Sequence, residues 1–169
     1  MISCEWLLGC QTAPGELPKE WFLASVPGCA QKDYARAHHW PDVFWADNAK
    51  MYDGLENLYW RYRTVPRFPE IGAGERLYFV AKGVDYEFDI LIGGKTVFSQ
   101  EGLFTPVELD VTELLHEGDA LEVLIHPAPK RAGAAPHSRE EADQSVKPAV
   151  SYGWDWHPYL VASKPSTPA

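Results

Sequence analysis

Short segments in which apolar and polar residues alternate dominate the middle of this chain of 169 residues. They span residues 58–65, 86–92, 107–111 and 121–125, and a nearly continuous apolar run occupies 76–81. Successive side chains of a strand point to opposite faces, so this alternation predicts strands with one face in a core. The run at 76–81 predicts a central strand covered on both sides. Since no amphipathic stretch of twelve residues occurs, a fold built on long helices is excluded.

Turn residues separate these segments at hairpin-like spacing. Gly93 and Gly94 stand between 86–92 and 95–99, where a two-residue loop requires positive φ at both positions. We therefore expect an all-β chain: an antiparallel β-sandwich of jelly-roll type, with short helical turns. One such helix is predicted around 31–37.

Residues 29–57 form a long aromatic loop in this interpretation. Trp40, Phe44 and Trp45 are interleaved with Asp, Asn and His, and we expect these rings to cover a sheet edge. The alternative makes Trp40 and Asp42 part of the rim of a binding site.

The C-terminal third changes in composition. Residues 127–147 contain few apolar anchors, which predicts a mobile loop or a short surface helix. We expect one domain over residues 1–163. The residues rich in Pro, Ser and Thr at 164–169 are interpreted as a linker or a chain end.

Composition limits the function. Hydrophobic residues make up 46% and charged residues 23% of the chain, which suits one soluble globular domain. A (β/α)₈ barrel needs about 250 residues and does not fit. The net charge of −9 argues against nucleic acid as a partner. The chain contains no apolar run of about 18 residues, which is the length that would predict a membrane span. The absence of a signal peptide weakly favours the cytoplasm, with a processed signal peptide as the alternative.

Metal and cofactor motifs do not stand out. Cys4, Cys10 and Cys29 follow no metal-ligand or redox spacing and are expected to be free thiols, with a fortuitous Cys4–Cys10 disulfide as the alternative. The histidines lack chelating spacing, and no glycine-rich phosphate loop occurs. We predict no metal and no cofactor.

The segment 151–158 is the candidate site. Trp154 and Trp156 offer flat apolar faces suited to sugar rings, and Asp155 can accept hydrogen bonds from two hydroxyls. The alternative is a buried aromatic plug in which Asp155 satisfies backbone N–H groups. His157 is either a second polar contact or a turn residue before Pro158.

An ordered set of motifs resembles the N-terminal sugar-binding domain of glycoside hydrolase family 2, in its β-mannosidase and exo-β-glucosaminidase branch. The set covers residues 20–161, and its members are Val26-Pro27-Gly28, Trp60-Arg61-Tyr62, Gly83-Val84-Asp85-Tyr86, Gly93-Gly94-Lys95, Gly102-Leu103-Phe104-Thr105-Pro106, Asp110-Val111-Thr112 with Leu115 and Gly118, and Lys147-Pro148 through His157-Pro158.

The resemblance implies a galactose-binding-like jelly roll packed against a catalytic barrel further along the same protein, acting on the terminal sugar of a β-linked oligosaccharide. The two catalytic glutamates of retaining hydrolysis, about 5 Å apart, belong to that barrel and have no counterpart here. Asp155 would bind hydroxyls of the terminal sugar, with Trp154 and Trp156 as the wall. A stand-alone carbohydrate-binding module and a purely structural domain are the alternatives. The chain departs from the family after residue 163, where relatives continue through a Gly-Ile-Trp-like strand.

Overall fold

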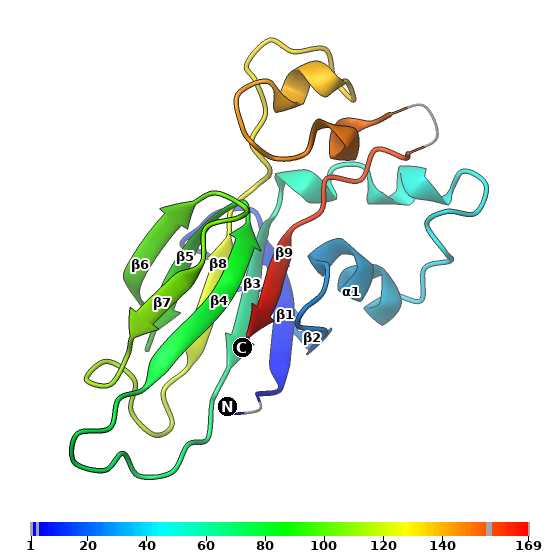
Figure 1. The fold of residues 1–169 in the computed structure, drawn as a ribbon. Coiled ribbons are helices and arrows are strands. Elements are labelled where there is room, and N and C mark those ends of the chain that lie inside the picture. The colour runs from blue at the N-terminus through cyan, green and yellow to red at the C-terminus, as the bar shows by residue number, and fades with distance from the viewer. Residues whose placement is uncertain (1, 3, 155–156, 169) are drawn as a thin grey trace.

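The fold is an antiparallel β-sandwich in a computed structural model that describes residues 2, 4–154 and 157–168 (Figure 1). Within them, one sheet has six strands in the order β2-β1-β3-β8-β5-β6, and the other has three in the order β7-β4-β9. The strands of the large sheet are β1 (Trp6–Gln11), β2 (Phe22–Ala24), β3 (Tyr59–Thr64), β5 (Glu87–Ile92), β6 (Lys95–Glu101) and β8 (Leu121–Ile125). Those of the small sheet are β4 (Tyr78–Asp85), β7 (Val107–Asp110) and β9 (Lys164–Pro168). The predicted all-β class is confirmed.

Helical segments are short. They are α1 (Ala30–Ala37) and the 3-10 helices η1 (Asn48–Tyr52), η2 (Leu55–Asn57), η3 (Arg139–Ala142) and η4 (Ala149–Tyr152). The helix predicted at 31–37 is therefore confirmed as α1. None of the helices in the described part of the chain is long and apolar enough to cross a membrane.

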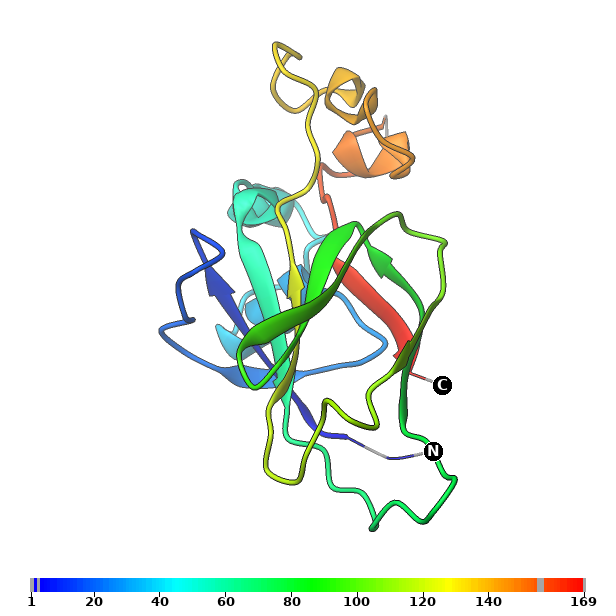
Figure 2. The ribbon, with the colours of Figure 1, turned by 90° about the vertical axis from the view of Figure 1, so that its left-hand side faces the viewer.

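The core lies between the two sheets, which face each other in Figure 2. On β3, Trp60 and Tyr62 point inward and are fully buried, as the alternation predicted. Phe88 and Ile90 of β5 do the same. The outer face of the large sheet buries a charged pair instead, with Nη1 of Arg61 on β3 located 2.9 Å from Oε2 of Glu122 on β8.

The hairpin between β5 and β6 is confirmed. Gly93 and Gly94 have φ of 56° and 79°, and Ile92 pairs with Lys95 across the turn. Both glycines adopt the left-handed conformation that a side chain would disfavour.

The interpretation of 164–169 as a linker is wrong for the residues described. Lys164–Pro168 form β9, which pairs antiparallel with β4, Asp85 opposite Lys164 and Ala81 opposite Pro168. An edge strand tolerates proline because its outer side needs no N–H donor. Composition could not reveal this pairing, since it depends on the open edge of β4.

One other expectation about the sheets is wrong, and one strand was missed. The run 76–81 was expected to be covered on both sides, but Tyr78 is exposed because the small sheet leaves the outer side of β4 open. Strand β1 was not predicted, since the turn residues of the first thirty positions masked its pattern.

The aromatic residues of the loop at 29–57 differ in burial. Trp40 packs edge-on against Tyr34 of α1 and Tyr52 of η1, with ring centroids 5.4 and 5.2 Å apart, so its ring joins the hydrophobic core through these two helices. Phe44 and Trp45 are exposed, and for them the expectation that they cover a sheet edge is wrong. Asp42 lies in the turn that separates the two groups: its Oδ1 accepts a hydrogen bond from Phe44 N at 3.0 Å.

Residues 126–163, here called the small lobe, were expected to begin with a mobile loop or a surface helix. They include η3 and η4, stand above the sandwich in Figure 1, and enclose a small apolar core. That core contains buried Ala142, Tyr152 and Val161, packed with half-buried Ala128 and Tyr159. The lobe is thus an ordered excursion between β8 and β9.

The three cysteines, Cys4, Cys10 and Cys29, are free thiols, as expected. Burial raises the pKa of Cys29 above its ordinary value, which keeps this thiol protonated at neutral pH.

Asp110, at the end of β7, provides a test at low pH. The Thr112 hydroxyl donates to Oδ1 at 2.6 Å, Thr112 N donates at 3.0 Å, and Arg76 donates to Oδ2 at 2.5 Å. These hydrogen bonds, led by that of the Thr112 hydroxyl, lower the pKa of Asp110 from 3.8 to about 2. Because the folded pKa lies below the ordinary one, the stabilisation is present above pH 3.8 and is lost as the pH falls through about 2.

We expect an NMR titration of the Asp110 carboxyl group to show a midpoint near pH 2. Thr112→Ala should move this midpoint upward, because it removes the hydroxyl donor. A midpoint at the ordinary value of 3.8 in the unmodified chain would contradict the arrangement.

Candidate functional site

The loop predicted as the candidate site projects from the small lobe. Trp154 and His157 form an isolated antiparallel bridge, in which Trp154 N donates to His157 O at 3.3 Å and His157 N donates to Trp154 O. Asp155 and Trp156 lie between them and outside the described residues. The structure therefore brings together the two ends of the loop, which are two of the four predicted site residues.

The N-terminal end of this loop is anchored by Tyr152, the last residue of η4. Its side chain is fully buried, and its hydroxyl donates to Pro129 O at 2.6 Å. Burial is the main cause that raises the Tyr152 pKa well above its usual range. Gly153 follows with φ 103° and ψ 129°, a conformation that is essentially restricted to glycine. The chain can therefore turn outward directly after the buried tyrosine.

The C-terminal end is anchored by Tyr159. Its hydroxyl lies 2.9 Å from Oε2 of Glu141 and 3.5 Å from Oε1 of Glu56, and both glutamates are buried. Nζ of Lys130 lies 2.7 Å from Glu56 Oε1 and 3.6 Å from Glu141 Oε1. The Tyr159 ring also stacks on His137, with centroids 4.3 Å apart. Burial, followed by the charge of Glu56, raises the pKa of Tyr159 strongly, so the phenol remains a hydrogen-bond donor.

A buried ion pair attaches the lobe to the sandwich. Nζ of Lys147 lies 2.6 Å from Oδ1 of Asp85 at the end of β4, and it also donates to Ala162 O at 2.6 Å. Burial lowers the pKa of Lys147, and the Asp85 carboxylate opposes this shift. The Asp85 carboxylate therefore pairs across the fold with a residue of the small lobe.

Trp154, at the start of the loop, is accessible and lies beside a positive charge. Trp154 is 40% exposed, so in this chain it does not form a buried plug. The guanidinium of Arg139 lies over its ring at 4.1 Å. Together with Ser138 and Gly153, these residues line a surface hollow of about 390 Å³. Sequence reasoning missed Arg139, since its segment resembles a solvated charged stretch.

His157 is half-buried, and its Nδ1 lies 2.7 Å from the carbonyl oxygen of Pro158. This contact with the adjacent main chain fits the turn role considered for His157, and leaves Nε2 as the ring atom for any contact with a ligand.

A larger hollow, of about 720 Å³, lies on the outer face of the large sheet. Its charged lining groups are all paired: Arg61 and Arg63 with Glu122 of the same hollow, and Asp89 and Asp119 with His126 and His116 outside it. Over the residues that the structure describes, no group of three or more His, Cys, Asp and Glu side chains could hold a metal ion.

Comparison with known proteins points to one family. A family model described as the glycosyl hydrolase 2 galactose-binding domain-like family matches residues 10–165. Beta-mannosidase B of Thermothelomyces thermophilus is 26% identical over 140 residues, which cover 76% of this chain and 16% of that protein. Mannosylglycoprotein endo-beta-mannosidase of Lilium longiflorum is 22% identical over 155 residues, which cover 85% of this chain and 16% of that protein.

Solved structures agree on the fold. The beta-D-mannosidase of Dictyoglomus thermophilum has a TM-score of 0.72 and 25% identity, and the similarity covers 97% of this chain and 21% of that one. The exo-chitosanase of Amycolatopsis orientalis has a TM-score of 0.62 and 19% identity, and the similarity covers 78% of this chain and 17% of that one. The chain thus spans about a fifth or less of the length of these proteins.

Proposed function

Because this chain belongs to the galactose-binding-like domains of glycosyl hydrolase family 2, we propose that it is the non-catalytic N-terminal domain of a β-mannosidase-like exo-glycosidase. In this proposal the catalytic barrel lies outside the chain, and the small lobe supplies the loop that recognises the terminal sugar of a β-linked oligosaccharide. The matched β-mannosidases, each several times longer than this chain, support the assignment.

The observation that carries the proposal is the anchored loop. Tyr152 and Tyr159 fix its two ends through buried hydroxyl contacts, while Trp154 stays accessible. Flanking residues held in this way are preorganised, which lowers the entropy lost on binding. We propose that Asp155 accepts hydrogen bonds from two sugar hydroxyls, that Trp154 and Trp156 form the wall, and that His157 contributes a secondary polar contact.

The test is Asp155→Ala in the full-length polypeptide. We expect kcat/KM for a β-mannoside to fall more than tenfold, because about 1.4 kcal/mol or more of transition-state binding is lost. Asp143→Ala is the matched control: Asp143 is an exposed aspartate of the same lobe, paired with Arg131 at 3.5 Å, and its removal should leave kcat/KM unchanged. Full activity of Asp155→Ala would refute the role of the loop. Parallel assays on β-glucosaminides, galactosides and glucuronides identify the sugar.

A stand-alone carbohydrate-binding module is the second candidate, favoured by the exposure of Trp154 in this chain. It requires saturable binding of free oligosaccharide by the isolated chain. Calorimetry that shows no heat up to tens of millimolar ligand would exclude it in favour of the enzyme domain.

A further inference from the structure

A second aromatic surface lies in the segment that connects α1 with η1. Phe44 and Trp45 are 63% and 76% exposed, and Met51 of η1 is also exposed. Single exposed apolar residues are common, but two adjacent aromatic rings with a methionine close in sequence suggest a surface that another molecule covers. We call Phe44, Trp45 and Met51 the aromatic knob.

The turn that carries the aromatic knob is built by specific hydrogen bonds. Asp42 organises it: its Oδ1 accepts from Phe44 N at 3.0 Å, and its main-chain oxygen accepts from Trp45 N at 3.2 Å and from Asn48 Nδ2 at 2.8 Å. Ala46 has φ of 50°, a left-handed conformation that costs a non-glycine residue of the order of 1 kcal/mol. The rings are thus held outward by a defined turn.

Charged residues surround the aromatic knob. Nζ of Lys32 lies 5.3 Å from the centroid of the Phe44 ring, and Lys50 pairs with Asp47 at 3.0 Å on the exposed side of η1. An aromatic centre with a charged rim is typical of protein–protein interfaces, in which Trp and Phe act as anchors. These features favour a protein surface as the occupant over a sugar.

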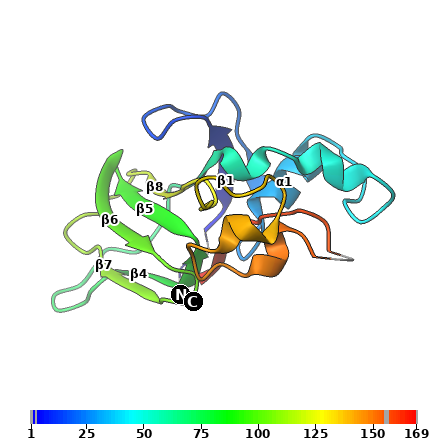
Figure 3. The ribbon, with the colours of Figure 1, turned by 90° about the horizontal axis from the view of Figure 1, so that it is seen from above.

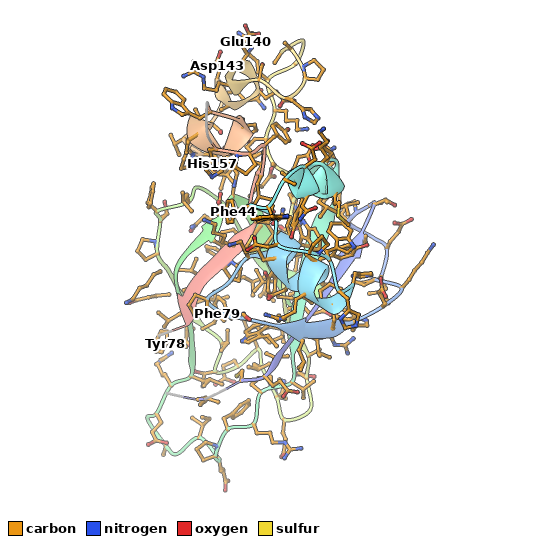
Figure 4. All side chains as sticks on the ribbon, turned by 90° about the vertical axis from the view of Figure 1, so that its right-hand side faces the viewer. Phe44, Tyr78, Phe79, Glu140, Asp143 and His157 are labelled. Atoms are coloured by element: carbon orange, nitrogen blue, oxygen red, sulfur yellow. The ribbon has the colours of Figure 1, made fainter. Side chains whose placement is uncertain are left out.

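The knob and the small-lobe residues Trp154 and His157 lie on the same side of the molecule. In Figures 1 and 3 the connection between α1 and η1 and the segment that carries Trp154 both project toward the right. Figure 4 views that side and shows Phe44 below His157. A body that meets this side of the small lobe therefore also faces the knob.

We propose that the aromatic knob docks into an apolar concavity on the remainder of the same polypeptide, and so aligns the small-lobe loop with it. The proposal rests on the proposed function, since it takes the chain to be one domain of a longer enzyme. Its support is the exposure of the knob, its position on the same side of the molecule as His157, and the span of only 16% to 21% of the relatives' lengths.

Hydroxyl-radical footprinting tests the proposal on the full-length polypeptide and on the isolated chain. We expect the oxidation rates of Trp45 and Phe44 to be at least fivefold lower in the full-length protein. Leu17, which is 68% exposed in the β1–β2 connection on another side of the molecule (Figure 3), should react equally in both and calibrates the radical dose. Equal oxidation of Trp45 in the two proteins would overturn the proposal.

A substitution tests whether docking of the knob stabilises the full-length protein. Trp45→Ser should lower the melting temperature of the full-length protein by several degrees and leave that of the isolated chain unchanged, because the ring contacts the remainder only in the former. Leu17→Ser, the matched control, should change neither. An equal shift of the melting temperature in both proteins would contradict docking.

Other occupants give different results, and each overturns the proposal. Protection of Trp45 that appears in the isolated chain as its concentration rises identifies a second copy. Protection that appears only after oligosaccharide is added identifies sugar. A natural gene product of 19 kDa, the mass of this chain, leaves no remainder to dock. The proposed sugar role fails separately, through an active Asp155→Ala variant, and leaves Trp45 protection unaffected.

Discussion

Lys147→Met is expected to destabilise the chain by about 3–5 kcal/mol, because it leaves the Asp85 carboxylate buried without its partner. The side chains of Lys147 and Asp85 are 2% and 6% exposed and 2.6 Å apart. The substitution also removes the donor to Ala162 O. Urea unfolding followed by circular dichroism gives the free energy of unfolding for each variant.

Two control variants identify the cause of that loss. Lys50→Met removes an ion pair of similar length, 3.0 Å to Asp47, in which both side chains are exposed, and should cost less than about 1 kcal/mol. The double variant Lys147→Met with Asp85→Leu should recover much of the stability, since it leaves no unpaired buried charge. A Lys147→Met variant as stable as Lys50→Met would show that the buried pair does not hold the lobe.

Tyr152→Ala is the second large effect. Removing this fully buried ring from the small core of the lobe should cost the lobe about 3–5 kcal/mol, the range for deleting a buried aromatic side chain. Tyr152→Phe keeps the ring and removes only the hydrogen bond to Pro129 O, so about 1–3 kcal/mol is expected. Comparison of the two variants separates the contribution of ring packing from that of the hydroxyl hydrogen bond.

Amide hydrogen exchange locates this effect. In Tyr152→Ala, amides of the small lobe should exchange faster, while those of β3 and β8 in the large sheet keep their protection, because the lobe has its own core and opens separately. Tyr78→Ala, a change at an exposed tyrosine of β4, is the control and should alter exchange little. Faster exchange throughout the sandwich would mean that the lobe and the sandwich unfold as one unit.

The sandwich core could be predicted because its pattern is local. On β3, alternation correctly placed Trp60 and Tyr62 inside, since the direction of a strand side chain depends only on its position along the strand. The Gly93-Gly94 hairpin follows from two adjacent residues for the same reason. Strand β9 could not be predicted in this way, because its residues resemble a linker and only the open edge of β4 makes them a strand.

At the candidate site, residue types predicted a sugar contact from Trp154 to His157, since aromatic rings beside a carboxylate suit a sugar whatever the fold around them. Tertiary structure decided what anchors this loop. The hydroxyl of Tyr159 contacts Glu56, a residue 103 positions away, and Lys147 of the small lobe reaches Asp85 at the end of β4. Sequence alone therefore predicted the strands of the sandwich core, because their patterns depend on neighbouring residues. The fold alone decided the buried network and the exposure of Trp45, because both depend on which distant segments meet.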